Sequence, residues 1–397
     1  MAALNLHDVI DAAAAIRPDS ALHALRRRRD KVTDATQGCY DELFGAPQDA
    51  GLRLTERLVV ALDMCRAAGV QALATHYRDA LAAAGAGADE QAIAAEGTAV
   101  PRDPRLAEIM AFARAVGAEP HTTDRAALDR LQAVGLAPED IVTLGQLVGF
   151  VSYQLRLVAG LAALGGLVDD NANDGAASAG AAAQASAAPF VHPANLPPPG
   201  EPLRLNGYTS ETLGWTSWLP VVDPEVATPE QLAVLDASHP KAKTQDFYMV
   251  LVHQPGILNV RSAAFNAIMY APGGLPRHER EVVTTVVSRI NRCVYCASVH
   301  AQRYEQLAKR NEIIAQLFAD PLTAGTDERE RALVAAAAAL TQSPGTFGGD
   351  TLLRLRAAGL SDLELLDVVH AAALFAWANR LMLNLGEAVY PTASSAA

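Results

Sequence analysis

The sequence predicts an all-α protein built from two tandem helical domains. Half of its 397 residues are hydrophobic, but only 5% are aromatic. Ala is abundant, whereas runs rich in Val, Ile and Thr are few. This composition favours helices that pack through small side chains over a sheet protein. The chain is also too long for one compact core, so we expect two domains.

A stretch from about residue 169 to residue 202 separates the two predicted domains, 1–168 and 203–397. It is rich in Ala, Gly and Ser and ends in a run of prolines. No apolar periodicity is present in it, and the prolines prevent a continuous helix. We therefore expect this stretch to be a linker.

The two halves resemble each other at an offset of 224 positions. Matched residues keep this spacing over about eighty positions: His76 and His300, Asp103 and Asp327, Arg156 and Arg380. The segment 133–136 also falls on the similar segment 357–360. A shared spacing of this length predicts a duplicated all-α domain, with a period much longer than that of a solenoid repeat.

The second half has the pattern of several consecutive helices. Apolar residues at helical spacing predict helices over about 277–291, 296–309 and 327–340, then a fourth helix after Gly359 and a last helix that contains 368–385. In the first of these segments β-branched residues also fit a strand, but pairs of apolar residues every four positions favour a helix. Ser361 and Glu364 form a capping box that opens the fourth helix, and Gly386 is placed to end the last one.

The segment from Cys293 to His300 carries the candidate chemistry. Two cysteines separated by two residues can close a disulfide within a turn at a helix start. Unpaired backbone N–H groups and the helix dipole stabilise a thiolate there, and the thiolate is the reactive form. Cys296 and His300 are i and i+4, so they share one helix face. Histidine is the side chain best suited to move protons near neutral pH.

Glu281 lies twelve positions before Cys293. The order Glu-x11-Cys-x-x-Cys-x-x-x-His resembles that of the alkylhydroperoxidase D family, which belongs to the larger carboxymuconolactone decarboxylase-like superfamily. The flanking segments 275–281, 288–291 and 379–381 also resemble this family. The resemblance is strongest to its peroxidase-related members and covers roughly residue 203 to the C-terminus. The first half looks like a diverged relative of the same superfamily.

The resemblance implies two antiparallel helical domains of the alkylhydroperoxidase type and a role for each site residue. Cys296 would be the peroxidatic thiolate and Cys293 the resolving thiol, with a disulfide between them as the product. His300 and Glu281 would form the proton relay. An external dithiol, in the family a lipoyl-bearing protein, would regenerate the pair. No haem, flavin or metal cofactor is implied. Tyr295 stands where some members have a histidine, which shifts the expected reactivity.

The first half lacks the cysteine pair. At the offset of 224, Gly69 and Ala72 stand in place of the two cysteines, and Arg57 or Glu56 stands near the place of the glutamate. Only His76 remains, so we expect a structural role for this half and a hydrogen-bonded helix histidine. The alternative is that His76 acts as the base of a different reaction, since non-thiol members of the superfamily include decarboxylases.

Charge and hydropathy limit the partners. The net charge is -12, and the single basic run, 26–29, is followed at once by Asp30, so we expect a solvated helix face and no nucleic-acid partner. No signal-peptide pattern is present, and the apolar runs 332–340 and 371–378 are shorter than the ~20 residues of a membrane span. We expect a cytoplasmic protein with no membrane partner. The family resemblance implies a homo-oligomer, with a trimer of duplicated chains forming a pseudo-hexamer.

The function expected from these features is reduction of hydrogen peroxide or small organic hydroperoxides. Two alternatives use the same segment differently: a thiol–disulfide oxidoreductase or redox sensor without peroxide turnover, and a non-catalytic assembly partner. A zinc site is disfavoured, because zinc takes four ligands and no second cysteine pair exists. We expect His278 and Tyr295 to lie either at the pocket or in the core. We expect Leu374, Phe375 and Trp377 to be core residues, and Cys39 and Cys65 to occupy buried apolar positions.

Overall fold

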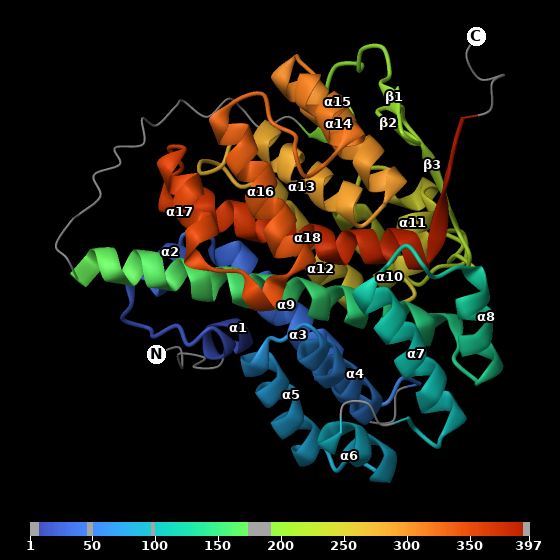
Figure 1. Cartoon of the computed structure of the whole chain (residues 1–397). Coiled ribbons are helices and arrows are strands. Elements are labelled where there is room, and N and C mark those ends of the chain that lie inside the picture. Colours follow the sequence, from blue (N-terminus) through green and yellow to red (C-terminus); the bar gives the residue numbers. More distant parts are fainter. Residues whose placement is uncertain (1–7, 46–50, 97–99, 174–191, 392–397) are drawn as a thin grey trace.

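The computed structural model describes residues 8–45, 51–96, 100–173 and 192–391. Over these residues the protein is helical throughout, apart from two small two-stranded sheets (Figure 1). The prediction of an all-α fold is confirmed. The buried apolar side chains of both halves form one continuous cluster.

The first half is entirely helical in the described residues. Its helices are α1 (Val9–Ala13), α2 (Ala21–Arg27), α3 (Asp30–Phe44), α4 (Leu54–Ala67), α5 (Gln71–Ala83), α6 (Ala88–Ala95), α7 (Pro104–Ala118), α8 (Arg125–Ala133) and α9 (Pro138–Asn173). The last of these helices continues to Asn173, so the linker begins later than the predicted residue 169. Residues 174–191 of that linker lie outside the described residues.

The second half adds nine helices and four short strands in the described residues. The helices are α10 (Pro229–Ser238), α11 (Asp246–Leu251), α12 (Pro255–Met269), α13 (Arg277–Ile290), α14 (Val294–Ala308), α15 (Glu312–Ala319), α16 (Glu328–Gln342), α17 (Gly349–Ala357) and α18 (Asp362–Asn384). The strands are β1 (Arg204–Leu205), β2 (Tyr208–Thr209), β3 (Gly214–Ser217) and β4 (Gly386–Val389). Both sheets are antiparallel: β1 pairs with β2, and β3 pairs with β4.

Local capping explains several helix boundaries of the second half. The Ser361 N–H donates to Glu364 Oε2 at 2.7 Å, which completes the predicted capping box at the start of α18. Asp327 caps α16 by accepting from the Glu330 N–H at 2.8 Å. The fourth and last predicted helices are one continuous helix, α18. Gly386 follows the C-cap Leu385, which is the C′ position predicted for it; it has no positive φ and opens β4.

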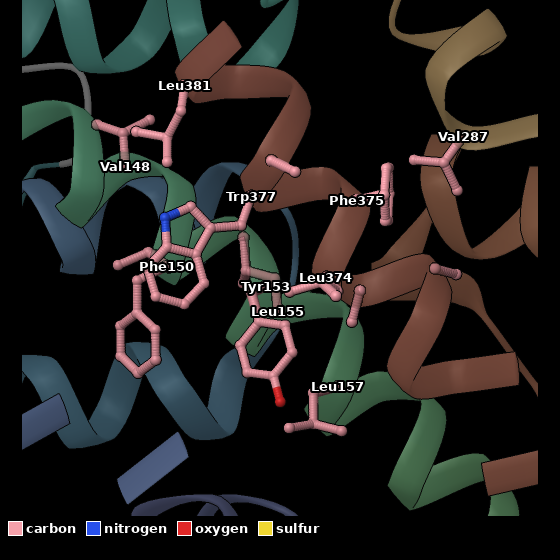
Figure 2. Close-up of a cluster of buried hydrophobic side chains, with 14 of the residues drawn as sticks. Val148, Phe150, Tyr153, Leu155, Leu157, Val287, Leu374, Phe375, Trp377 and Leu381 are labelled. Carbon is pink, nitrogen blue, oxygen red and sulfur yellow. The ribbon is translucent and has the colours of Figure 1, made fainter. Parts of the chain in front are cut away.

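Helices α9 and α18 lie side by side through the middle of the molecule (Figure 1). Trp377 of α18 packs against Phe150 and Tyr153 of α9, with ring centroids 5.3 and 6.1 Å apart (Figure 2). The Trp377 Nε1–H donates to Gln146 Oε1 at 3.0 Å. Both helices are long and apolar enough to span a membrane, but 83% and 100% of their apolar windows are buried inside the protein. They are core helices of the folded chain.

The helix boundaries of the two halves correspond at nearly constant offsets. The offset is 224 for α6 and α15, for α7 and α16, and for α8 and α17, and it is 223 for α4 and α13. The start of α14 also lies 223 positions after the start of α5. These equal lengths and offsets support the proposal that the chain arose by duplication. The domain boundaries remain a prediction.

Hydrogen bonds between the halves are reciprocal. Arg156 of α9 donates to the Thr341 carbonyl in α16 at 2.7 Å. Its counterpart Arg380 of α18 donates to the Gly117 carbonyl in α7 at 2.6 Å. Gly117 and Thr341 are themselves related by the offset of 224. The two halves therefore pack as an isologous pair, with the same contact made twice.

Candidate functional site

The predicted dithiol lies at the connection between α13 and α14. Arg292, with φ of +59°, reverses the chain after α13, and Cys293 is the N-cap of α14. The Cys293 Sγ accepts from the Cys296 N–H at 3.4 Å. Cys296 therefore lies in the first turn of α14, where backbone N–H groups and the helix dipole favour an anionic sulfur.

The two cysteines differ in their access to solvent-filled space. Both are free thiols. Cys296 lines a cavity of about 280 Å³, whereas Cys293, 1% exposed, lies behind it in the core. Burial and a hydrogen bond with the Cys296 side chain raise the pKa of Cys293 well above its usual value. Cys293 is therefore a thiol at neutral pH, and only Cys296 meets a molecule in the cavity.

Glu281 and His300 form a buried pair at the same cavity. The His300 Nδ1 lies 2.5 Å from Glu281 Oε2, and both residues are under 10% exposed. The imidazole and the Phe375 ring are nearly perpendicular, with centroids 4.4 Å apart. Because Nδ1 bonds to the carboxylate, Nε2 is the nitrogen left for proton transfer. The structure thus brings Glu281, His300 and Cys296 to one cavity, with Cys293 behind Cys296.

The cavity wall is aromatic and carries several cations. Its aromatic residues are Phe247, Tyr248, Phe265, Tyr270, Tyr295 and Phe375. Its cationic residues are Lys241, Arg261, Arg277 and Arg303. Glu281 is the one carboxylate that lines it among the described residues. The cavity can therefore hold a small organic molecule next to Cys296.

Sequence reasoning missed most of this wall. Phe375 was predicted to be core only, but it also contacts His300 and lines the cavity. Tyr295 lines the cavity, whereas His278 is not part of its wall. Burial raises the pKa of the Tyr295 hydroxyl to about 12. Arg261 comes from α12, more than thirty positions before Cys296. No spacing in the sequence relates residues of different helices. The one sequence signal for Arg261 is that it is the single charged residue of an otherwise mostly apolar helix.

The first half has no equivalent of this site. Its helix boundaries give an offset of 223 for α5, so Val70 and Leu73 stand in place of the cysteines. Tyr77, and not His76 as the offset of 224 suggested, takes the place of His300. The offset is 223 for α4 and the start of α5 and 224 from α6 onward, because α14 and the connection after it are together one residue longer than α5 and the connection after it. His76 Nε2 lies 2.8 Å from the Tyr40 hydroxyl, and burial lowers its pKa.

Within the part of the chain that the structure describes, no three His, Cys, Asp or Glu side chains gather in a way that could hold a metal ion. Cys296 shares the cavity with His300, and its backbone N–H donates to the Cys293 sulfur behind it. The arrangement is suited to thiol chemistry: a helix-start sulfur, a second sulfur in contact with it, and an imidazole held by a carboxylate.

Comparison with known proteins gives a family match over part of the chain. Residues 255–339 match the model of the carboxymuconolactone decarboxylase family. None of the curated proteins matches the chain. One similar solved structure is described as an alkylhydroperoxidase AhpD core, an uncharacterized peroxidase-related protein from Ralstonia eutropha JMP134. It is 24% identical, with a TM-score of 0.37, over 41% of this chain and 87% of that chain.

A second similar structure is that of an uncharacterized peroxidase-related protein from Silicibacter sp. TM1040. It is 25% identical, with a TM-score of 0.36, over 41% of this chain and 84% of that chain. The matched family segment, 255–339, contains Glu281, Cys293, Cys296 and His300. This part of the chain is therefore similar to the carboxymuconolactone decarboxylase family.

Proposed function

We propose that this protein is a thiol-dependent hydroperoxide reductase in which Cys296 attacks the peroxide. The observation that carries the proposal is the shared cavity: Cys296 and His300 both line it, and Glu281 holds the imidazole from behind. Cys293 lies in contact with Cys296 but away from the cavity. This order, with one sulfur in front and one behind, suits a peroxidatic and a resolving thiol.

In the first step His300 takes the proton of Cys296, and the thiolate attacks the terminal oxygen of the hydroperoxide. A sulfur–oxygen bond forms as the O–O bond breaks, so sulfur is oxidised and the peroxide reduced. The alkoxide leaving group takes the proton from His300 and departs as an alcohol. The Glu281 carboxylate stabilises the imidazolium between the two proton transfers.

In the second step the Cys293 sulfur attacks the sulfenic acid on Cys296. A disulfide forms, the S–O bond breaks, and water leaves with the Cys293 proton. The raised pKa of Cys293 keeps it protonated until then, which limits its reactions to the sulfur beside it. An external dithiol, for which a lipoyl-bearing protein is our proposal, reduces the disulfide by exchange. We also propose a cytoplasmic location and a homotrimer.

The test is mass spectrometry after one equivalent of cumene hydroperoxide. Wild type is expected to lose two hydrogens to the 293–296 disulfide, and Cys293→Ser is expected to gain one oxygen on Cys296. Cys296→Ser is expected to consume no peroxide in a dithiol-coupled assay. Cys65→Ala, which removes a buried cysteine away from the cavity, should behave as wild type. Unchanged turnover in Cys296→Ser would refute the proposal, and disulfide exchange without peroxide turnover would favour the oxidoreductase.

A further inference from the structure

The charge of the cavity is opposite to that of the chain. The protein has a net charge of -12, yet four cations and one carboxylate line the space in front of Cys296. A concave site lined by one sign of charge raises the local concentration of ligands of the other sign. The cavity therefore favours an anion, although the molecule as a whole repels one.

Arg261 is the cation with the strongest demand for an anionic partner. It is 4% exposed, and burial lowers its pKa. Among the described residues it forms no hydrogen bond or ion pair, and its Nε–H is buried without an acceptor. Its guanidinium carbon lies 5.3 Å from the Phe247 ring centroid and 5.8 Å from that of Trp377. These cation–π contacts offset only part of the cost of burying an unpaired charge.

The second cation at the cavity is more exposed and better satisfied. Arg303 of α14 donates to the Pro193 carbonyl at 3.0 Å and to Gln306 Oε1 at 2.8 Å. It is held in place by these bonds and contributes its charge to the cavity mouth. Arg261 can thus contact one anionic group directly, while the positive charge of Arg303 attracts that group into the cavity.

The rest of the wall suits a flat apolar body. Aromatic rings from α11, α12, α14 and α18 surround the cavity, and its volume of about 280 Å³ is at the lower end for small-molecule sites. Aromatic walls favour planar ligands through offset and edge-to-face contacts. A ligand of this shape that carries a carboxylate would satisfy Arg261 with charge-assisted hydrogen bonds.

Building on the proposed peroxidase activity, we propose that the preferred substrate is a small aromatic hydroperoxide that carries a carboxylate, with Arg261 as the residue that binds this group. The reaction is the one described above: the peroxide O–O bond breaks, the hydroperoxide becomes an alcohol, and the carboxylate is unchanged. Arg261 is then a specificity-determining residue, and the neutral hydroperoxides are poorer substrates.

The test compares a matched pair of hydroperoxides, cumene hydroperoxide and its 4-carboxylate. The measured quantity is the rate constant for Cys296 oxidation in a single turnover. Wild type is expected to favour the carboxylate by about tenfold or more, the value of one charge-assisted pair. Arg261→Gln should bring the ratio of the two rate constants close to one. Arg28→Gln, which removes an exposed charge in the first half, should leave the ratio unchanged.

Two results would overturn the proposal. One is a wild-type ratio near one; the other is an Arg261→Gln variant that slows both substrates equally, because Arg261 would then serve the Cys296 thiolate. Circular dichroism checks that this variant folds. If it does not, Arg303→Gln replaces it and is expected to lower the ratio about threefold, as a charge at the mouth would; an unchanged ratio there would count against the proposal.

A binding experiment separates this proposal from the peroxidase proposal. Isothermal titration of 4-isopropylbenzoate, which has no peroxide, is expected to show binding to wild type at least tenfold tighter than to Arg261→Gln and about threefold tighter than to Arg303→Gln. If wild type consumes no hydroperoxide but binds this carboxylate, the peroxidase proposal fails and the anion site stands. If the carboxylate gives no heat of binding with wild type, the anion site is refuted whatever the turnover.

Discussion

At the scale of single residues, the site depends on how one imidazole is held. His300 faces Cys296 from one helical turn away, and its Nδ1 is fixed by Glu281 at 2.5 Å. Phe375 presses against the ring edge, so the imidazole has one orientation. A carboxylate in this position sets the tautomer and stabilises the imidazolium that forms during proton transfer. The pair is therefore more informative about mechanism than either residue alone.

Replacing Glu281 by Gln tests this relay. The amide still reaches Nδ1, but it carries no charge to stabilise the imidazolium and can select the wrong tautomer. We expect the rate of Cys296 oxidation to fall about 100-fold, within the range of general acid–base effects. Stopped-flow measurement of the single turnover checks this. Glu279→Gln is the matched control, because Glu279 lies on the same helix but pairs with Arg329 outside the cavity. Equal rates in the two variants would remove Glu281 from the relay.

His370 predicts a pH-dependent loss of stability. It is fully buried in α18 with an unpaired Nδ1, and burial lowers its pKa to about 3. The unfolded chain binds a proton near pH 6.5, whereas the folded protein resists it until about pH 3. The stability due to the neutral residue is present above pH 6.5 and is lost as the pH falls toward 3. This contribution falls by about 2 kcal/mol between pH 7 and pH 5.

His370→Leu removes this titration, so its stability should fall less between pH 7 and pH 5 than that of wild type. Urea unfolding of both proteins at pH 7 and pH 5 measures how much unfolding free energy each loses between the two pH values. Parallel loss in the two proteins would mean that the folded state protonates His370 without penalty.

At the scale of helices, the sequence predicted the second half well where the signal was local. The segment 277–291 corresponds to α13, and the capping box at Ser361 and Glu364 opens α18 as expected. Such features depend on neighbours within one turn. The walls of the cavity depend on contacts between helices, so residue spacing could not predict that Arg261 and Phe375 line it. The one-residue shift in α5 was hidden because His76 resembles His300 by coincidence.

The end of α14 offers a test of local strain. Lys309 follows this helix with φ of +59°, whereas the matching residue of the first half, Gly85, has φ of +75°. A left-handed conformation costs a side-chain-bearing residue about 1–2 kcal/mol, and the flexibility of Gly in the unfolded chain returns about 0.5–1 kcal/mol of this. Lys309→Gly should therefore stabilise the protein by about 0.5–1 kcal/mol in urea unfolding. Lys309→Ala keeps the β-carbon and should give no gain; equal stability of both variants would contradict the argument.

At the scale of the molecule, the duplicated helices make one core in place of two. The reciprocal bonds of Arg156 and Arg380 join each long helix to the other half. The first half also supplies Arg29, which pairs with Asp367 at 2.7 Å next to Arg280 of the second half. The first half, which lacks the cysteine pair, thus supports the helix that carries Phe375 and closes the cavity. This dependence explains how it can be retained without a site of its own.

The close approach of α9 and α18 depends on glycine at the crossing. A β-carbon on Gly149 would lie 2.1 Å from the Trp377 ring, whereas one on Gly166 in the same helix would meet nothing within 4 Å. Helix propensity alone favours Ala over Gly by about 1 kcal/mol at both positions. We therefore expect Gly166→Ala to stabilise the protein by up to about 1 kcal/mol.

Gly149→Ala should instead destabilise it by about 2 kcal/mol, because overpacking at a rigid indole outweighs the gain in propensity. The two unfolding midpoints in urea should move in opposite directions. Trp377 also holds Gln146 through its Nε1–H, so displacement of the ring loosens the interface of the halves. If Gly149→Ala were as stable as Gly166→Ala, the close approach of α9 to Trp377 would not contribute to the stability of the interface between the halves.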